Sequence, residues 1–277
     1  MAGRLEFIDI TGFDVNEIGR EHIYSLWRRG GLPRSFLALS EADSVAWRRD
    51  FIRTFLERDI PQIGIRIPTV AMRRFWTMLA HWHGQIWNAS EFSRSLGVSD
   101  KTARGYLDLL TGTFMIRQLQ PWFTNVSKRQ VKAPKVYFRD TGLLHALLGA
   151  ETERDLLGNP RVGASWEGFI MEQILCALNQ PQAWFWAAHS GGEIDLLVQF
   201  RGRWLGFEIK FAEAPTISKL VHKTAELLAL DHLFVVCPAR RAYTISEVIS
   251  VLPASEIRDL NSHIESLSES TLRPDPK

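Results

Sequence analysis

The chain has 277 residues, of which 45% are hydrophobic and 23% charged, a composition typical of folded proteins and too apolar for disorder. Its 33 basic and 31 acidic residues leave a formal net charge of +2, so any nucleic-acid-binding surface has to be local. The two cysteines, Cys176 and Cys237, exclude a disulfide scaffold and a Cys/His zinc motif. No apolar run approaches the about 18 residues of a membrane span, and residues 1–6 lack a signal-peptide core. We therefore expect a cytoplasmic protein without a membrane partner.

A Walker-type ATP site needs the pattern G-x-x-x-x-G-K-[ST], in which the lysine contacts the phosphates. The chain contains no Gly-Lys pair anywhere, and its Gly-Gly doublets are isolated. We expect no ATP binding by this chain alone.

Residues 1–82 are predicted to form a helical segment. Ser40 is placed to cap a helix over 41–60, which Pro61 closes. Apolar residues at helical spacing predict another helix over about 69–82.

Residues 83–145 carry the pattern of a winged helix-turn-helix. We expect a short helix over 90–96, a glycine-containing turn over 97–99 and a second helix, capped by Ser99, over 100–110. Two strands are expected over 114–116 and 135–138. A basic loop connects the two strands.

Cations gather in this unit. Residues 101–139 contain eight of them, opposed only by Asp108, for a local formal charge of +7. Clustered cations beside a capped helix are typical of nucleic-acid binding. We expect six to contact DNA, namely Lys101, Arg104, Lys128, Arg129, Lys132 and Lys135. The alternative is a solvated loop on a winged helix that contacts protein.

Residues 146–261 predict a second domain of mixed α/β type with the element order α-β-β-β-α-β. Its expected elements lie at residues 162–178, 183–187, 193–200, 203–211, 217–230 and 232–237. Residues 262–277, rich in Ser, Glu and Pro, are expected to form a flexible tail.

The hairpin at residues 193–211 carries a candidate catalytic group. Alternation along its first strand places Ile194, Leu196, Val198 and Phe200 on one face, so Asp195 points to the other. On the second strand Glu208 and Lys210 project together. Asp195, Glu208 and Lys210 are therefore expected to converge at one end of the sheet.

Two carboxylates and a lysine suit a hard divalent cation and the water that it activates. We expect Mg²⁺ or Mn²⁺ at Asp195 and Glu208, with Glu167 of the preceding helix as an additional ligand. Lys210 would stabilise charge on a scissile phosphate. The alternative is a metal-free ion pair across the two strands.

Seven stretches of the chain carry a family resemblance, namely Gly30-Gly31-Leu32-Pro33, Phe55-Leu56-Glu57-Arg58-Asp59-Ile60, Lys101-Thr102-Ala103-Arg104-Gly105-Tyr106-Leu107, Pro134-Lys135-Val136-Tyr137-Phe138-Arg139-Asp140-Thr141-Gly142-Leu143, Trp166-Glu167-Gly168-Phe169, Glu193-Ile194-Asp195 and Glu208-Ile209-Lys210. Together they resemble the C-terminal part of a family of predicted AAA-type ATP-binding proteins of bacteria and archaea. The resemblance implies a winged helix followed by a domain similar to the PD-(D/E)XK restriction-endonuclease fold. Its nuclease motif falls on Glu167, Asp195, Glu208 and Lys210.

Members of that family begin with a P-loop ATPase domain, which this sequence lacks. Gly3-Arg4 looks like the end of that domain, and residues 1–82 would then be a remnant of its lid or linker. Three functions follow as hypotheses. The first is a DNA-interacting module of an AAA-type protein, and the second is a metal-dependent endonuclease. The third is an inactive scaffold for protein partners or for assembly as a homo-oligomer.

Overall fold

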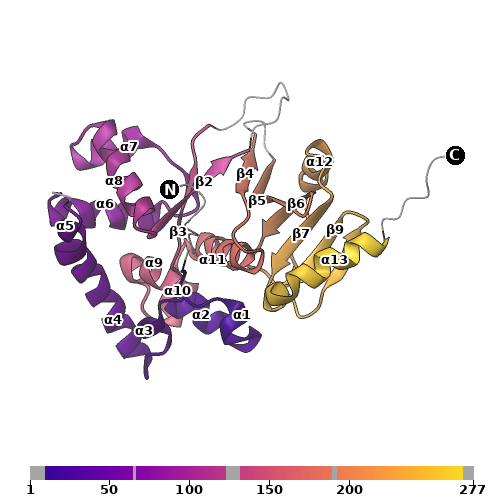
Figure 1. Cartoon of the computed structure of the whole chain (residues 1–277), viewed down its shortest axis with the longest axis horizontal. Coiled ribbons are helices and arrows are strands. Elements are labelled where there is room, and N and C mark those ends of the chain that lie inside the picture. The colour runs from indigo at the N-terminus through magenta and orange to yellow at the C-terminus, as the bar shows by residue number, and fades with distance from the viewer. Residues whose placement is uncertain (1–9, 65–66, 123–131, 189–191, 271–277) are drawn as a thin grey trace, which may run out of the picture.

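A nine-stranded mixed sheet runs through the protein in a computed structural model that describes residues 10–64, 67–122, 132–188 and 192–270. The strands are β1 (Gln85–Ile86), β2 (Ile116–Pro121), β3 (Lys135–Phe138), β4 (Ala183–Ala187), β5 (Glu193–Phe200), β6 (Arg203–Ile209), β7 (His232–Cys237), β8 (Tyr243–Ser246) and β9 (Ile249–Pro253). Their order across the sheet is β1-β3-β2-β4-β5-β6-β7-β9-β8 (Figure 1). A short parallel pairing of β2 with β4 joins the two halves of the chain.

The helices flank this sheet and form most of the N-terminal half. They are α1 (Val15–Ile18), α2 (Ile23–Arg29), α3 (Pro33–Phe36), α4 (Glu41–Thr54), α5 (Ile60–Gln62), α6 (Thr69–His81), α7 (Ala89–Leu96), α8 (Asp100–Gly112), α9 (Thr141–Leu148), α10 (Glu153–Leu157), α11 (Val162–Ala177), α12 (Lys219–Leu227) and α13 (Leu260–Ser270). None of the helices in the described ranges has both the length and the apolar run needed to cross a membrane.

The predicted cap at Ser40 is confirmed, because its side chain accepts a hydrogen bond from the Asp43 amide at the start of α4. The helix continues through a π-helical turn, Phe55–Asp59, and α5 ends at Gln62, one residue beyond Pro61. Pro61, which has no backbone N–H to donate, directly follows the π-helical turn and Ile60, and the helical run ends at the next residue.

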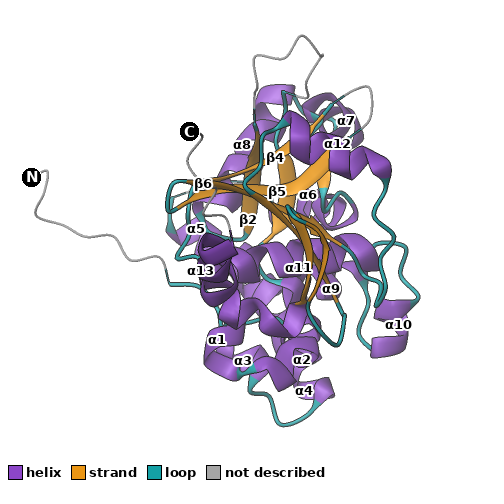
Figure 2. Ribbon diagram, turned by 90° about the vertical axis from the view of Figure 1, so that its right-hand side faces the viewer, coloured by secondary structure: helices purple, strands orange, loops and turns teal. Residues whose placement is uncertain are grey.

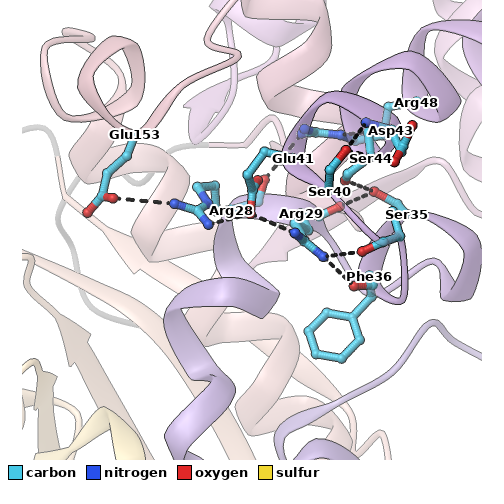
Figure 3. Close-up of polar contacts among 11 residues, drawn as sticks. Arg28, Arg29, Ser35, Phe36, Ser40, Glu41, Asp43, Ser44, Arg48 and Glu153 are labelled. Atoms are coloured by element: carbon cyan, nitrogen blue, oxygen red, sulfur yellow. Dashed lines mark hydrogen bonds and ion pairs between the residues drawn. The ribbon is translucent and has the colours of Figure 1, made fainter.

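Polar contacts tie α2, α3 and α4 together (Figure 3). Glu41 accepts hydrogen bonds from Arg28 at 2.5 Å and from Arg29 at 2.9 Å, and these contacts hold the pKa of its carboxyl below the ordinary value despite partial burial. The buried guanidinium of Arg48 donates to the carbonyl oxygens of Arg28 and Gly142. Arg48 therefore links this helical corner to α9.

Two of the resemblance motifs pack against each other. The Asp140 carboxylate, which caps α9, accepts hydrogen bonds from the amides of Gly31 and Leu32 at 2.8 and 3.2 Å. A Cβ atom at Gly142 would clash with the carbonyl oxygen of Arg29. Glycine at position 142 thus allows the backbone of the α2–α3 turn to approach the start of α9 closely.

The unit formed by α7, α8, β2 and β3 follows the predicted order. Ser99 caps α8 through the Thr102 amide, and the turn between the helices contains Gly97 in a left-handed conformation. The predicted strand over 114–116 was displaced, since β2 begins only at Ile116. The displacement arises because α8 runs to Gly112 and a turn at Phe114, with φ of 61°, ends it.

In the second half, β4, β5 and β7 have the predicted bounds, whereas β8, β9 and α13 were not predicted. The expectation of a flexible tail from residue 262 is wrong as far as Ser270. Leu260 and Ile264 of α13 are buried in the core at a spacing of one helical turn, which outweighs the polar composition of this segment. Residues 271–277 lie outside the described part of the chain.

The sheet has an apolar core on each face. On one face α11 and α13 cover a core that includes Leu196, Val198 and Phe207. On the other face α12 packs over Ile194, Leu197 and Val235, among others. Figure 2 shows α11 and α13 on one side of the sheet and α12 on the other.

Candidate functional site

Two carboxylates from neighbouring strands lie buried at the end of the β5–β6 hairpin. Asp195 and Glu208 are only 7% and 6% exposed. Leu196 of β5 pairs with Phe207 of β6, and the antiparallel register therefore places the adjacent residues Asp195 and Glu208 opposite each other. The Asp195 carboxylate accepts the Ile209 amide at 2.8 Å. Glu208 pairs with the ammonium of Lys210 at 2.6 Å. The structure thus brings the three predicted catalytic residues together.

Side chains along β5 do not alternate between the two faces of the sheet as predicted. Opposite Trp184 and Trp186 of β4 stand Leu197 and Ile194 of β5, so β5 contains one extra residue in this interval. Ile194 accordingly packs with Leu197 on the α12 face, and the prediction that it shares a face with Leu196 and Val198 was wrong. Such a β-bulge redirects side chains locally, and it occurs here beside Asp195.

Lys135 is the member of the site that sequence reasoning placed elsewhere. Its ammonium contacts the Glu193 carboxylate and lies 3.5 Å from Glu167 and 4.0 Å from Asp195. Lys135 is only 5% exposed within β3, so it cannot serve as the predicted phosphate contact on a wing. Tyr137, two residues on and on the same face of β3, donates its hydroxyl to Glu167 at 2.5 Å.

We call this group the carboxylate cluster; it consists of Lys135, Tyr137, Glu167, Glu193, Asp195, Glu208 and Lys210. Its one available sequence signal was the alternation of Lys135 and Tyr137 in an otherwise apolar strand, which puts both side chains on one face. Nothing local in the sequence indicates that this face meets α11 and β5.

Burial and like charges raise the pKa of both central carboxyls. For Asp195 burial acts first, followed by the carboxylates of Glu167 and Glu208, and the pKa lies well above its ordinary range. Burial also raises the pKa of Glu208, against the opposing effect of Lys210. Burial alone would lower the pKa of Lys135, but Tyr137 and the surrounding carboxylates outweigh it and keep the ammonium protonated.

The carboxylate oxygens of the cluster are donors that suit a divalent cation, but only two of the three predicted ligands could hold it. Mg²⁺ is commonly held by one or two carboxylates, with water and substrate phosphate completing its shell. The Oε2 atom of Glu208 is buried and has no hydrogen-bond partner in the described residues, so it retains an unused acceptor. Within those residues no three His, Cys, Asp or Glu side chains converge as a metal-ligand group. Asp195 and Glu208 could hold an ion as a pair, whereas Glu167, the third predicted ligand, is directed to Tyr137 and Lys135.

The predicted nucleic-acid face is only partly described. Lys101 and Arg104 are exposed on α8, and Lys132 is exposed just before β3. Arg104 and Lys132 line one polar hollow between α7, α8 and β2. Lys128 and Arg129 lie outside the described residues.

Two further cations of the basic segment are neutralised internally. Arg117 donates to the buried carboxylate of Glu172 at 2.9 Å, and Arg139 lies 3.6 Å from the same carboxylate. Together with Lys135, these residues do not add to an external basic face. The local charge available to a ligand is therefore smaller than the sequence count.

Comparison with known proteins divides the chain near the start of α11. The chain matches two domains of unknown function in succession. Residues 20–154 match the domain DUF8612, and residues 162–257 match the domain DUF4143. The carboxylate cluster therefore draws Lys135 and Tyr137 from the first matched region and its remaining members from the second.

Two uncharacterized mycobacterial proteins are similar over almost the whole chain. They are Rv2008c of Mycobacterium tuberculosis and Mb2031c of Mycobacterium bovis, each 46% identical over 268 residues, which is 97% of this chain and 61% of the relative. The chain thus spans about three fifths of the length of these curated relatives. No solved structure shows a significant match.

Proposed function

We propose that this chain is a DNA-interacting module in which a winged helix contacts the duplex and an adjoining nuclease-like unit binds one divalent cation. The observation that carries the proposal is the buried pair of Asp195 and Glu208, with Lys210 beside it. One oxygen of Glu208 has no hydrogen-bond partner in the described part of the chain. Oxygen donors of this kind favour Mg²⁺ or Mn²⁺. The bound ion would supply positive charge for a phosphate group and a water of lowered pKa.

The chain's own residues would prepare the site for that ion. Asp195 is held in place by the Ile209 amide, and Lys210 neutralises one oxygen of Glu208. The side chain of Lys210 is 44% exposed, so an incoming phosphate could also reach it. Burial of both carboxylates disfavours their charged forms, and a cation would relieve that cost.

The outer face of α8 supports contact with DNA. Lys101 and Arg104 are exposed there, and neither forms an ion pair within the described part of the chain. Gly105 is also exposed, and no atom of the described residues lies within 4 Å of the position that its Cβ would occupy. A mid-helix glycine costs about 1 kcal/mol relative to alanine, and packing does not explain it here. Close approach of a DNA backbone to α8 would explain a glycine at this position.

We further infer that the module works within a protein of the AAA-type ATPase family. Motifs similar to that family occur in both halves of the chain, from Gly30-Gly31-Leu32-Pro33 to Glu208-Ile209-Lys210. The mycobacterial relatives also exceed the matched length. Coupling to ATP hydrolysis is a property that we assign to such a larger protein.

Fluorescence anisotropy with a labelled duplex tests the DNA proposal. Affinity should fall steeply with salt, with a log–log slope of about −0.9 for each phosphate neutralised. Replacing Lys101 and Arg104 by Glu should weaken binding and flatten that slope by about one to two. The control is Arg258→Glu, an exposed site two residues before α13. Figure 1 shows α13 across the molecule from α8. Equal effects of the α8 variant and the control would contradict the proposal.

A metal-dependent endonuclease is the second candidate, because Lys210 contacts Glu208 beside Asp195, as in the predicted catalytic group. Nicking of supercoiled plasmid in Mn²⁺, lost in Lys210→Ala while Mn²⁺ still binds, would establish it. DNA and Mn²⁺ binding without nicking would leave the binding module as the function. A scaffold for protein contact would show neither kind of binding.

A further inference from the structure

The carboxylate cluster already contains a cation of the protein's own. The Lys135 ammonium lies among three carboxylates, in contact with Glu193, 3.5 Å from Glu167 and 4.0 Å from Asp195. With about one twentieth of its surface exposed, this side chain is fixed in place by β3 and does not sample solvent. It also lies 5.5 Å from the centre of the Phe185 ring, as a cation–π contact.

On the basis of the proposed function, we propose that Lys135 is an internal cation that takes the place of a second metal ion, so that the cluster binds a single divalent ion at Asp195 and Glu208. The charges are consistent with this stoichiometry. The four carboxylates and the two lysines Lys135 and Lys210 leave a formal charge of −2 when all are ionised, which one divalent ion balances.

The arrangement divides the cluster into two parts. Glu167 and Glu193 are engaged by Lys135, and Glu167 also accepts the Tyr137 hydroxyl. On the other side the Oε2 atom of Glu208 has no hydrogen-bond partner among the residues that the structure describes, and the second oxygen faces Lys210. Asp195 stands between the two parts, because it lies near Lys135 and opposite Glu208. The open acceptor therefore belongs to the one carboxylate of the cluster that forms no ion pair with Lys135 within the described residues.

Lys135 also sets the affinity of the site. A fixed positive charge a few ångströms from a bound cation repels it, and this repulsion is strong where water is excluded. Glu193 opposes this effect, because it shares the Lys135 charge at the edge of the cluster, where it is 48% exposed. Two substitutions of opposite consequence follow.

Isothermal titration with Mn²⁺ on the full chain tests this assignment. Wild type should bind one ion. Lys135→Met should bind Mn²⁺ about tenfold more tightly, or bind a second ion, because the repelling charge is gone. Glu193→Gln should bind it several-fold more weakly. Lys223→Met, which removes an exposed lysine of α12, is the matched control and should behave as wild type.

The outcomes separate this inference from the proposed function. If wild type binds one ion and Lys135→Met leaves affinity and stoichiometry unchanged, the role of Lys135 is wrong while the metal site stands. If no variant binds Mn²⁺, the proposed metal function fails, and this inference fails with it. Should Lys135→Met not fold, Glu193→Gln alone decides, since tighter or unchanged binding by that exposed variant contradicts the assignment.

Discussion

The ammonium of Lys135 lies 3.5 Å from the carboxylate of Glu167, although the two residues belong to different matched domains. Lys135 comes from β3 and Glu167 from α11, and the shared sheet brings these elements together through the pairing of β2 with β4. The cluster therefore forms only when both halves of the chain are packed. If DNA binding displaced the unit formed by α7, α8, β2 and β3, the contact between Lys135 and Glu167 would change.

The pH dependence of stability provides a first test, on the metal-free protein. The pKa of Asp195 is raised in the folded chain by burial and then by Glu167 and Glu208. For such an acid, the stabilising contribution is complete below the unfolded pKa, ordinarily 3.8, and is lost as pH rises through the folded pKa. Asp195→Asn should therefore be more stable than wild type at neutral pH, by about 1.4 kcal/mol per unit of pKa shift.

Urea unfolding at several pH values between about 4 and 8 measures this difference. The difference in unfolding free energy between Asp195→Asn and wild type should increase as pH rises. A gap that stays constant, or that narrows with rising pH, would show that the folded pKa of Asp195 is not raised.

Substitution of Gly105 separates stability from DNA contact. Gly105→Ala should stabilise the chain by up to about 1 kcal/mol, because alanine has the higher helix propensity and open space surrounds this position. The same variant should bind DNA more weakly if α8 faces the duplex. Gly163→Ala, also in open space but in α11, should leave DNA binding unchanged. Unchanged DNA affinity in Gly105→Ala would argue against close approach at this helix.

The contact between the α2–α3 turn and α9 should be intolerant of a methyl group. Gly142→Ala places a Cβ atom against the Arg29 carbonyl, where backbone would have to move. We expect a loss of about 1–3 kcal/mol in unfolding free energy, the usual cost of overpacking. Thermal melting of Gly142→Ala beside Gly163→Ala measures it. Equal melting temperatures would mean that the two segments separate more easily than their packing indicates.

Local signals predicted several helix starts and strand bounds correctly, because caps and spacing act within a few residues. Ser40 and Ser99 begin helices where their side chains can accept a backbone amide, and the bounds of β4 and β5 follow from alternation and turn residues. The facing of Asp195 could not be predicted in the same way. A single extra residue opposite Trp184–Trp186 shifts the alternation, and the sequence of β5 shows no glycine or proline to mark it.

The prediction that Lys135 contacts DNA was wrong for a different reason. Its cationic neighbours in the sequence suggest an exposed phosphate contact, but the strand predicted to begin at Lys135, β3, pairs with both β1 and β2 in the sheet. The carboxylates that stabilise its charge come from α11 and β5, at least 32 residues away in the chain. Burial of a lysine depends on such distant partners, which composition and spacing do not reveal.

The measurement that tests the account most directly is the melting temperature with and without Mn²⁺ in wild type, Asp195→Asn and Glu208→Gln. Binding to the folded chain alone stabilises it by RT ln(1 + [L]/Kd), about 2.7 kcal/mol at a hundredfold excess over Kd. Wild type should therefore melt at a higher temperature in Mn²⁺, whereas both variants, folded and at least as stable in EDTA, should not respond. A wild-type melting temperature that ignores Mn²⁺, or an equal rise in all three proteins, would contradict a metal site at Asp195 and Glu208.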